Sequence, residues 1–382
     1  MIVLKKIILI LCFSLLFVPF SALAMEVTPK GKRAVLIDYN SGKVLYDKNM
    51  NEKVNVASLT KMMGLILIFE KIDNGSIKVN EKLTVSRTAM DMGGTQLWLE
   101  EGEKITIDDL LKGITMASAN DAMVLMAERV SGSEKAFVKE MNKKAKSLGL
   151  KNTHFVNVCG FDEDGHFSSA YDMALIAKEL LKHDKVLSYT GKYEDYIKEN
   201  TKDKSWIVNT NKLVKFYPGV DGLKTGFTDK SGSTIAVTSL KNNLRLIAVL
   251  LGYNNTKERN KEAVDLLDYG YSRYKNNVIF KKGKVMKEVK VPKSLNEKIK
   301  LTLKDDVKVL SKKEEKLKKY NYKIKTYNIK LPIKRGDTVG SLDLISDKKI
   351  ISKTPLIANK DVKKPNFIKG YLKVLSDFLG GA

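Results

Sequence analysis

Histidine and cysteine are scarce in this chain of 382 residues, and both shortages restrict its chemistry. The three histidines, His154, His166 and His183, are too few and too loosely spaced to form a catalytic zinc site. We expect neither a metal nor another cofactor. Of the two cysteines, Cys12 lies in a hydrophobic N-terminal segment that we expect to be removed. Cys159 is then alone, so an intrachain disulfide is excluded, and we interpret it as a small buried residue rather than a nucleophile.

The N-terminal segment has the three parts of a secretory signal. Lys5 and Lys6 precede an apolar run over residues 7–20, and small residues follow at Ala22 and Ala24. A charged start, a short apolar stretch and a site of this A-x-A form are typical of a cleaved signal peptide. An uncleaved anchor helix is the alternative. We predict a signal peptide over residues 1–24 and a secreted protein.

Positive charge is concentrated in the C-terminal third. The net charge is +24, and residues 276–382 hold 28 Lys and Arg against 11 Asp and Glu, which leaves only +7 for the rest. A basic surface of this kind can attract nucleic acid, an anionic membrane or an acidic polymer. Because the signal peptide directs the chain out of the cytoplasm, we do not expect a nucleic-acid partner.

Residues 25–275 combine strand and helix patterns. A hairpin is predicted over residues 33–38 and 43–46, and a second hairpin of β-branched strands over residues 234–240 and 244–251. Apolar residues at helical spacing predict helices over residues 57–73, 107–116, 120–130, 133–148, 170–181 and 257–274. Strands at both ends with helices between them indicate an α+β domain, an antiparallel sheet covered by helices.

The remaining chain has a different organisation. Short alternating stretches over residues 285–291, 298–303 and 322–331 predict a small all-β domain covering residues 276–358. Residues 359–382 are predicted to be a linker and an amphipathic helix, with apolar residues recurring from Phe367 to Leu379. This helix is too short and too polar to span a bilayer. We expect it to lie on an anionic membrane surface, although it could also pack on its own domain.

Ser58-Leu59-Thr60-Lys61 places a lysine three residues after a serine, before an apolar helix. Residues at this spacing share a helix face, so the Lys61 amine can reach the Ser58 hydroxyl. A hydroxyl needs a base to become a nucleophile, and a buried lysine can be neutral. The spacing alone is weak support, because it also occurs at Ser272 and Lys275 and at Ser346 and Lys349.

Two further motifs carry polar groups suited to peptide chemistry. Ser118-Ala119-Asn120 interrupts two helical patterns, where Ser118 could pass on a proton and Asn120 could hold a carbonyl. Helix capping is the structural alternative for this segment. Lys224-Thr225-Gly226 could offer a cation and a hydroxyl to a carboxylate, and Gly226 would let a substrate backbone approach. An ordinary strand start is the alternative there.

The order of the motifs is more specific than any one of them. S-x-x-K, S-x-N and K-T-G follow at intervals of 60 and 106 residues. This arrangement resembles the serine penicillin-recognising enzymes. Within that group, residues 33–274 resemble the low-molecular-mass D-alanyl-D-alanine carboxypeptidases, which include a small β domain and an amphipathic tail. One departure is the sequence Asn157-Val158-Cys159-Gly160, where the family usually has Asn-Pro-His-Gly or similar; we do not expect it to affect the chemistry.

The resemblance implies a catalytic role for several residues. Ser58 would attack the carbonyl between two D-alanines and form an acyl-enzyme, with Lys61 as base. Ser118 would relay a proton to the departing D-alanine. The main-chain N–H groups of Ser58 and Phe227 would form the oxyanion hole. The implied partners are the peptidoglycan stem pentapeptide and β-lactams, which would acylate the same serine.

The resemblance also implies a set of substrate-binding residues. Asn120 would position the peptide, and Lys224 and Thr225 would hold its terminal carboxylate next to Gly226. Arg259 lies where the family has an arginine that helps to bind this carboxylate. Two other functions stay open from the sequence. A class A-like β-lactamase shares the motifs but would need a deacylating carboxylate and no extra domain, and a degenerate relative would only bind peptidoglycan.

Overall fold

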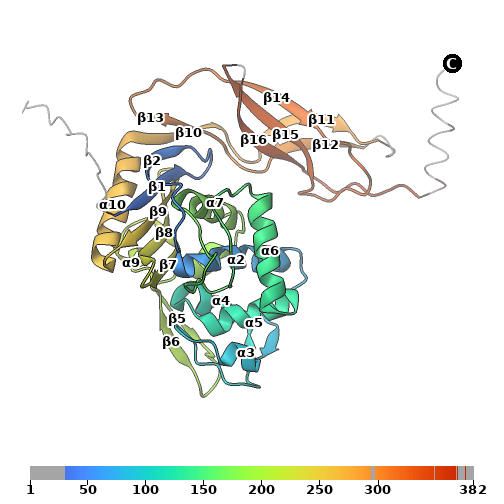
Figure 1. Ribbon diagram of the computed structural model, residues 1–382. Helices are drawn as coiled ribbons and strands as arrows, with labels where there is room; N and C mark the ends of the chain where they lie inside the picture. The colour runs from blue at the N-terminus through green and yellow to red at the C-terminus, as the bar shows by residue number, and fades with distance from the viewer. Residues whose placement is uncertain are drawn as a thin grey trace, which may run out of the picture.

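The computed structural model describes residues 31–292, 294, 297–347, 349–366, 368 and 375. They form a domain of sheet and helices followed by an all-β domain (Figure 1). The predicted α+β class is confirmed. The predicted signal peptide lies outside the described residues, and so does the predicted C-terminal helix apart from residues 368 and 375.

A five-stranded antiparallel sheet is the centre of the first domain. Its strand order is β2-β1-β9-β8-β7, so that β7 is an edge strand. The predicted hairpins are both present, and Asn242 and Asn243 take the positive φ angles that a tight two-residue turn requires. The strands are β1 (Arg33–Asp38), β2 (Val44–Lys48), β7 (Val220–Thr228), β8 (Gly232–Lys241) and β9 (Leu244–Tyr253).

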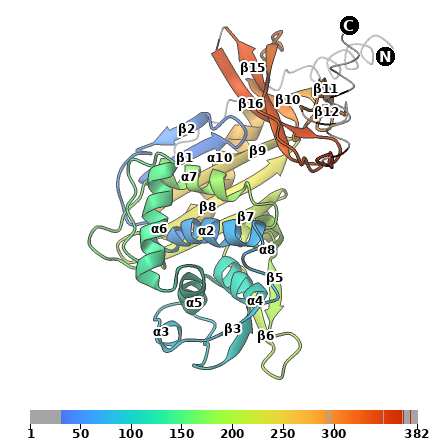
Figure 2. The same ribbon diagram turned by 90° about the vertical axis from the view of Figure 1, so that its right-hand side faces the viewer.

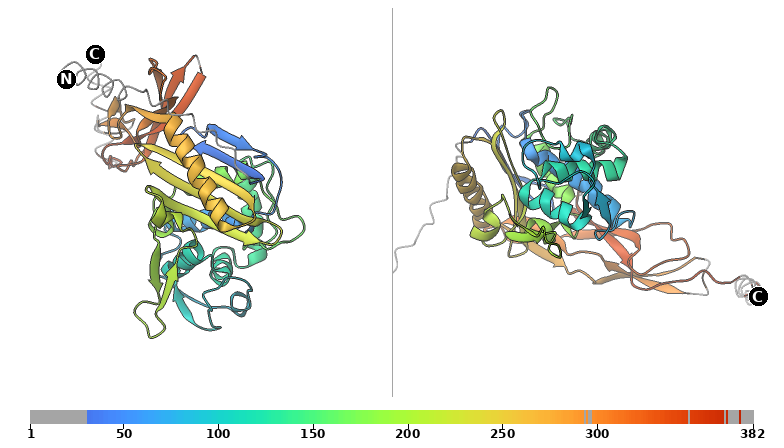
Figure 3. Two further views of the ribbon diagram at one scale, coloured as in Figure 1. Left: turned by 90° about the vertical axis from the view of Figure 1, so that its left-hand side faces the viewer. Right: turned by 90° about the horizontal axis from the view of Figure 1, so that it is seen from below.

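Alternating side chains of the sheet face two separate cores. Val35 and Val249 pack into the core shared with the helices α2 (Lys61–Asp73) and α7 (Ala170–Leu180), whereas Leu36 and Ala248 pack into the core beneath α10 (Thr256–Arg273). This is the period of two that a strand imposes on its side chains. Figure 2 shows α2 and α7 in front of β8 and β9, and Figure 3 shows α10 lying across the opposite face.

The helical part follows the predicted ranges with small shifts. Residues 57–60 form a 3₁₀ turn (η2) before α2, and the helix predicted over residues 107–116 changes to a π-helical turn (η3, Gly113–Ala117) after residue 112. Two short hairpins, β3 (Lys82–Thr84) with β4 (Lys104–Thr106) and β5 (Glu194–Ile197) with β6 (Ser205–Val208), lie beside the helices. The helices are α2 (Lys61–Asp73), α3 (Arg87–Met90), α4 (Ile107–Lys112), α5 (Asn120–Ser131), α6 (Glu134–Ser147), α7 (Ala170–Leu180), α8 (Val186–Thr190) and α9 (Leu213–Phe216).

Helix α2 is central because it is apolar on all sides. Every residue from Lys61 to Phe69 is buried, which is the behaviour expected of a helix without a polar face. At Gly64 a Cβ would come within 2.3 Å of Met123 on α5 and 3.3 Å of Phe137 on α6. The glycine therefore lets three helices approach closely, and this packing fixes the start of α2 at Lys61, directly after the η2 turn that holds Ser58.

The second domain contains more strands than the sequence predicted. Its five-stranded sheet has the order β11-β12-β16-β15-β14, while β10 and β13 pair beside the first domain. The strand predicted over residues 322–331 begins at Asn321 and ends earlier than predicted, at Thr326. The strands are β10 (Tyr274–Phe280), β11 (Val285–Lys290), β12 (Lys298–Leu303), β13 (Val307–Lys312), β14 (Asn321–Thr326), β15 (Thr338–Ser346) and β16 (Lys349–Ala358). Beyond β16, Val362 still pairs with Ile333 of this domain.

Candidate active site

The edge strand β7 lies directly against the turn that carries Ser58. A Cβ on Gly226 would come within 2.9 Å of the Ser58 main-chain nitrogen and 3.0 Å of Ala57 Cβ. A larger residue at this position would therefore push the strand away from the serine. The fold thus brings the first and third sequence motifs together, although 166 residues separate Ser58 from Lys224 in the chain.

Ser58 and Lys61 form the contact that the motif predicted. Lys61 Nζ lies 2.9 Å from Ser58 Oγ and donates a second hydrogen bond of 3.0 Å to the main-chain carbonyl of Cys159. Ser58 is partly exposed, whereas Lys61 is fully buried. The hydroxyl can therefore meet a substrate while its partner amine is shielded from water.

Burial makes Lys61 suited to act as a base. Loss of hydration lowers the pKa of its ammonium group, because the charged form is the one that burial disfavours. The carboxylate of Asp121, and Cys159 only in its thiolate form, act in the opposite direction with smaller effect. Burial also raises the pKa of the Cys159 thiol to about 11, so that this group is uncharged near neutrality and does not offset the change at Lys61.

The loop containing the unusual Asn157-Val158-Cys159-Gly160 sequence takes part in the site through its backbone. Asn157 Oδ1 accepts hydrogen bonds from the main-chain N–H groups of Cys159, Gly160 and Phe161, at 3.2, 2.7 and 3.1 Å. These bonds hold the Cys159 carbonyl in place for Lys61. Sequence reasoning missed this contribution, because a carbonyl is common to every residue type. The Cys159 side chain is buried, as predicted, with Sγ 3.8 Å from the carbonyl of Asn120.

Ser118 and Asn120 lie at a break between η3 and α5. Ser118 has a left-handed φ of 68°, and Asn120 begins α5 while its Nδ2 donates to the carbonyl of Gly93 at 2.7 Å. The capping alternative is wrong here, because α5 has Ala119 at its N-cap and no side-chain cap bond. Within the described residues, no hydrogen bond joins Ser118 Oγ to Ser58 or Lys61. The motif reaches the site through the contact between Asn120 and Cys159.

Asp121 is a site residue that the sequence analysis overlooked. Its fully buried carboxylate accepts hydrogen bonds from the N–H groups of Leu97, at 2.9 Å, and Leu99, at 3.3 Å. It thereby holds the loop around Trp98 next to the start of α5. The signal available from the sequence was an acidic residue in a helix first turn, and this is too common to indicate such a role.

Lys224 is fully buried in the middle of β7 rather than at a strand start. Its pKa is well below the usual lysine value, chiefly because of burial and also because the Arg259 guanidinium, and Lys61 when it is protonated, would repel a charge on Lys224. Lys224 Nζ donates to the carbonyl of Thr225 at 2.8 Å, and Thr225 Oγ1 donates to Thr210 Oγ1 at 2.7 Å. An anionic group placed here would relieve the repulsion among these cations.

Phe227 and Arg259 extend the site in two directions. Phe227 is 63% exposed and lies one residue before the end of β7 at Thr228. Arg259 reaches from α10 and is buried, with Nη1 donating to the carbonyl of Thr234 at 3.1 Å and Nη2 to Asn260 Oδ1 at 2.8 Å. Burial lowers its pKa to about 10. Because Thr234 pairs with Gly226, Arg259 supports the strand next to β7.

Acidic residues between the second and third motifs have structural partners. Asp162 Oδ1 accepts from Asn55 Nδ2 at 2.7 Å and from Thr228 Oγ1 at 2.9 Å. Glu163 accepts from Asn157 Nδ2 at 2.8 Å. Both carboxylates therefore connect the 157–163 loop to its surroundings, which is unlike a carboxylate reserved for activating water.

A buried lysine beside a partly exposed serine, next to a sheet edge, is the arrangement expected of a serine hydrolase of the penicillin-recognising class. Residues 21–255 match the family model described as D-alanyl-D-alanine carboxypeptidase, and residues 274–364 match the C-terminal domain of penicillin-binding protein 5. The chain therefore belongs to the D-alanyl-D-alanine carboxypeptidase family, as predicted. It is a penicillin-binding enzyme of the serine type that removes D-alanine from cell-wall peptides, and members of its family act on peptidoglycan outside the cytoplasm.

Similar proteins cover nearly the whole chain. It is 46% identical over 354 residues to the D-alanyl-D-alanine carboxypeptidase DacF of Bacillus subtilis, covering 92% of this chain and 91% of that protein. It is 33% identical to DacA of Escherichia coli, over 89% and 86% of the two chains. Penicillin-binding protein 5 of Haemophilus influenzae has a similar structure, with a TM-score of 0.67, 29% identity, and coverage of 88% of this chain and 100% of that one.

A further solved structure carries a bound antibiotic. Penicillin-binding protein D2 of Listeria monocytogenes in its ampicillin-bound form has a TM-score of 0.58 and 30% identity, over 64% of this chain and 99% of that one.

None of the helices in the described part of the chain is long and apolar enough to cross a bilayer.

Proposed function

We propose that Ser58 is the nucleophile of this carboxypeptidase and that neutral Lys61 is its base. The observation that carries the proposal is the 2.9 Å contact between Ser58 Oγ and the fully buried Lys61 Nζ. Lys61 takes the hydroxyl proton while Oγ attacks the carbonyl carbon between the two terminal D-alanines. The N–H groups of Ser58 and Phe227 stabilise the oxyanion that forms.

The acyl-enzyme then forms and breaks down in two steps. The C–N bond breaks as Ser118 gives its proton to the departing amine and regains one from protonated Lys61, so that free D-alanine leaves and an ester on Ser58 remains. Water adds to this ester, the Ser58 Oγ–C bond breaks, and the hydroxyl regains its proton. The shortened peptide is released with a new carboxylate. β-Lactams acylate the same hydroxyl by opening of their ring amide.

The substrate carboxylate binds at the end of the site that contains Lys224 and Thr225. Lys224 supplies positive charge and Thr225 a hydroxyl, and the absence of a side chain at Gly226 lets the peptide backbone approach β7. Asn120 holds the peptide from the opposite side. Arg259 acts from behind β8, where its charge adds to the field of Lys224.

Ser58→Ala tests the nucleophile. The variant should lose D-alanine release from a pentapeptide and covalent labelling by a fluorescent penicillin. Ser272→Ala is a matched control, because Ser272 also precedes a lysine by three residues but is exposed on α10. Release of D-alanine by Ser58→Ala at the wild-type rate would falsify the mechanism. If the wild-type enzyme were not labelled, the inactive peptidoglycan-binding alternative would be favoured. If it hydrolysed penicillin rapidly, the β-lactamase alternative would be favoured.

We also propose that the enzyme is secreted and works at the outer face of the cell membrane. The signal-like residues 1–24 and the amphipathic pattern from Phe367 to Leu379 support this proposal, together with the basic C-terminal third. Truncation after Val362 should release the protein from anionic vesicles in a sedimentation assay. Equal sedimentation of the truncated and full-length proteins would refute the role of the tail.

A further inference from the structure

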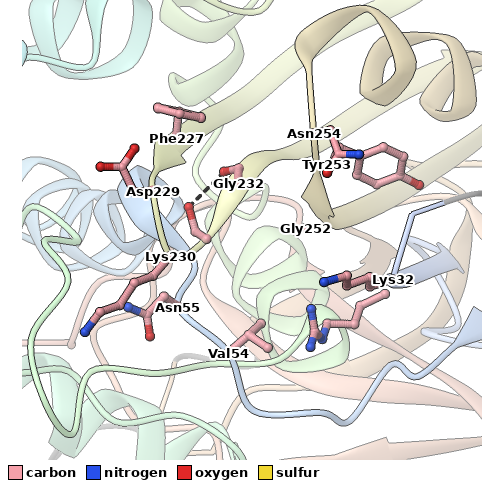
Figure 4. A pocket seen from close by; sticks show the side chains of 12 residues that line it. Lys32, Val54, Asn55, Phe227, Asp229, Lys230, Gly232, Gly252, Tyr253 and Asn254 are labelled. Atoms are coloured by element: carbon pink, nitrogen blue, oxygen red, sulfur yellow. Dashed lines mark hydrogen bonds between the residues drawn. The ribbon is translucent and has the colours of Figure 1, made fainter.

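A pocket lies beyond the end of β7, lined by Phe227 and by Asn55, three residues before Ser58. Its volume is about 450 Å³, and it is formed where the β7–β8 turn, the end of β9, the start of β1 and the segment before Ala57 meet. Figure 4 shows Lys32 and Lys230 on opposite sides of this pocket, with Val54 between them and Phe227 at its upper margin. None of the catalytic or carboxylate-binding roles above uses Lys32, Lys230 or the pocket itself.

Positive charge dominates the pocket wall. Lys32 and Lys230 are exposed, and in the described part of the chain neither ammonium group has a carboxylate within ion-pair distance. Arg33 pairs with Glu52 through Nη2, while its Nε is buried without a hydrogen-bond partner. Asp229 is the carboxylate that also lines the pocket. Because Glu52 balances Arg33, the two exposed lysines against Asp229 are the charges that favour an anionic ligand.

The position of the pocket relates it to the substrate. As an edge strand, β7 has backbone groups available to pair with an extended peptide. With the substrate carboxylate at Thr225 and the scissile carbonyl at Ser58, the rest of the peptide continues past Phe227. Asp229 is four residues beyond Thr225, or about 13 Å at the usual rise of about 3.3 Å per residue. The second or third residue before the scissile bond therefore reaches the pocket.

We propose that this pocket is a subsite for a carboxylate carried by the substrate peptide on the N-terminal side of the scissile bond. Lys32 and Lys230 provide the charge, and the exposed Phe227 side chain provides an apolar surface for the intervening chain. The subsite thus sets a preference among peptides that share the same D-alanyl-D-alanine end. This inference rests on the proposed function, because the orientation of the peptide depends on Ser58 and Thr225.

Two synthetic peptides ending in D-alanyl-D-alanine test the subsite. In both, γ-linked D-glutamate precedes lysine and the two D-alanines; its α-carboxylate is free in one peptide and amidated in the other. The wild-type enzyme should prefer the free carboxylate by about tenfold in kcat/KM, since each exposed ion pair contributes only modestly. Lys32→Gln combined with Lys230→Gln should reduce this preference to near unity, with unchanged hydrolysis of the amidated peptide.

Lys43→Gln is the matched control, because this exposed lysine lies at the opposite end of β1. It removes the same charge and should keep the full preference. Labelling by fluorescent penicillin reports whether Ser58 is intact in each variant, and the single lysine variants replace the double one if labelling is lost. Equal hydrolysis of the two peptides by wild-type enzyme, or an undiminished preference in the lysine variants, overturns the subsite. A failure of the proposed function gives a different result, because the Ser58→Ala variant would then still release D-alanine.

Discussion

Gly160→Ala tests how closely the 157–161 loop controls the nucleophile. Gly160 has a φ of +88°, and a Cβ added there would lie 1.9 Å from the carbonyl oxygen of Ala57 and 3.0 Å from the nitrogen of Ser58. Ordinary contact begins at 3.4 Å, so the loop and the Ser58 turn would have to separate by about 1.5 Å. Both groups are main chain, and neither can rotate away as a flexible side chain would.

This separation should damage acylation far more than it damages folding. Cys159 precedes Gly160 and its carbonyl holds Lys61, so a shift of the loop moves the base relative to Ser58. Misplacement of reacting groups by about 1 Å can cost about 100-fold in rate. We expect Gly160→Ala to slow labelling by a fluorescent penicillin, and release of D-alanine, by about that factor.

Gly165→Ala separates this effect from backbone strain. Gly165 lies in the same loop region with a φ of +84°, but its added Cβ would meet nothing nearer than 3.6 Å. Both variants therefore carry the left-handed penalty of about 1–2 kcal/mol, which urea denaturation measures. Acylation at the wild-type rate by Gly160→Ala, or an equal loss of acylation in Gly165→Ala, would show that the loop does not position Ser58 and Lys61 in this way.

Two further predictions concern Lys61 and the loop around Trp98 that Asp121 holds. Because burial lowers the pKa of Lys61, the fraction of neutral amine and with it the acylation rate should rise with pH and level off above that pKa, when followed between about pH 5 and pH 10. Lys61→Arg should be inactive throughout this range, and a flat profile in the wild-type enzyme would exclude a titrating base. Asp121→Asn places an amide N–H against the N–H groups of Leu97 and Leu99, and should lower the free energy of unfolding by about 2 kcal/mol in urea denaturation. Asp91→Asn, in an exposed ion pair, should change it by less than about 0.5 kcal/mol, and equal effects would contradict the role of Asp121.

Much of the fold could be predicted because local patterns agree with the final structure. The apolar stretch after Lys61 predicted α2, and the turn at Asn242 and Asn243 predicted the β8–β9 hairpin. The all-β domain was harder, because its strands are short and its exposed faces are rich in lysine, so that alternation is weak. The sequence predicted that the segment from Ser118 to Asn120 interrupts two helices. It did not predict the π-helical turn before Ser118 or the left-handed conformation of Ser118 itself.

The sequence by itself determined which side chains could perform the chemistry and in what order they occur. Ser58, Lys61, Ser118 and Lys224 were recognised from residue type and spacing, since covalent attack needs a hydroxyl, a base and a cation whatever their surroundings. Only the tertiary structure shows what suits Lys61 to the proposed role of base: full burial and the hydrogen bond to the carbonyl of Cys159. Burial and backbone contacts arise from segments about 100 residues apart in the chain, and no local pattern encodes such contacts.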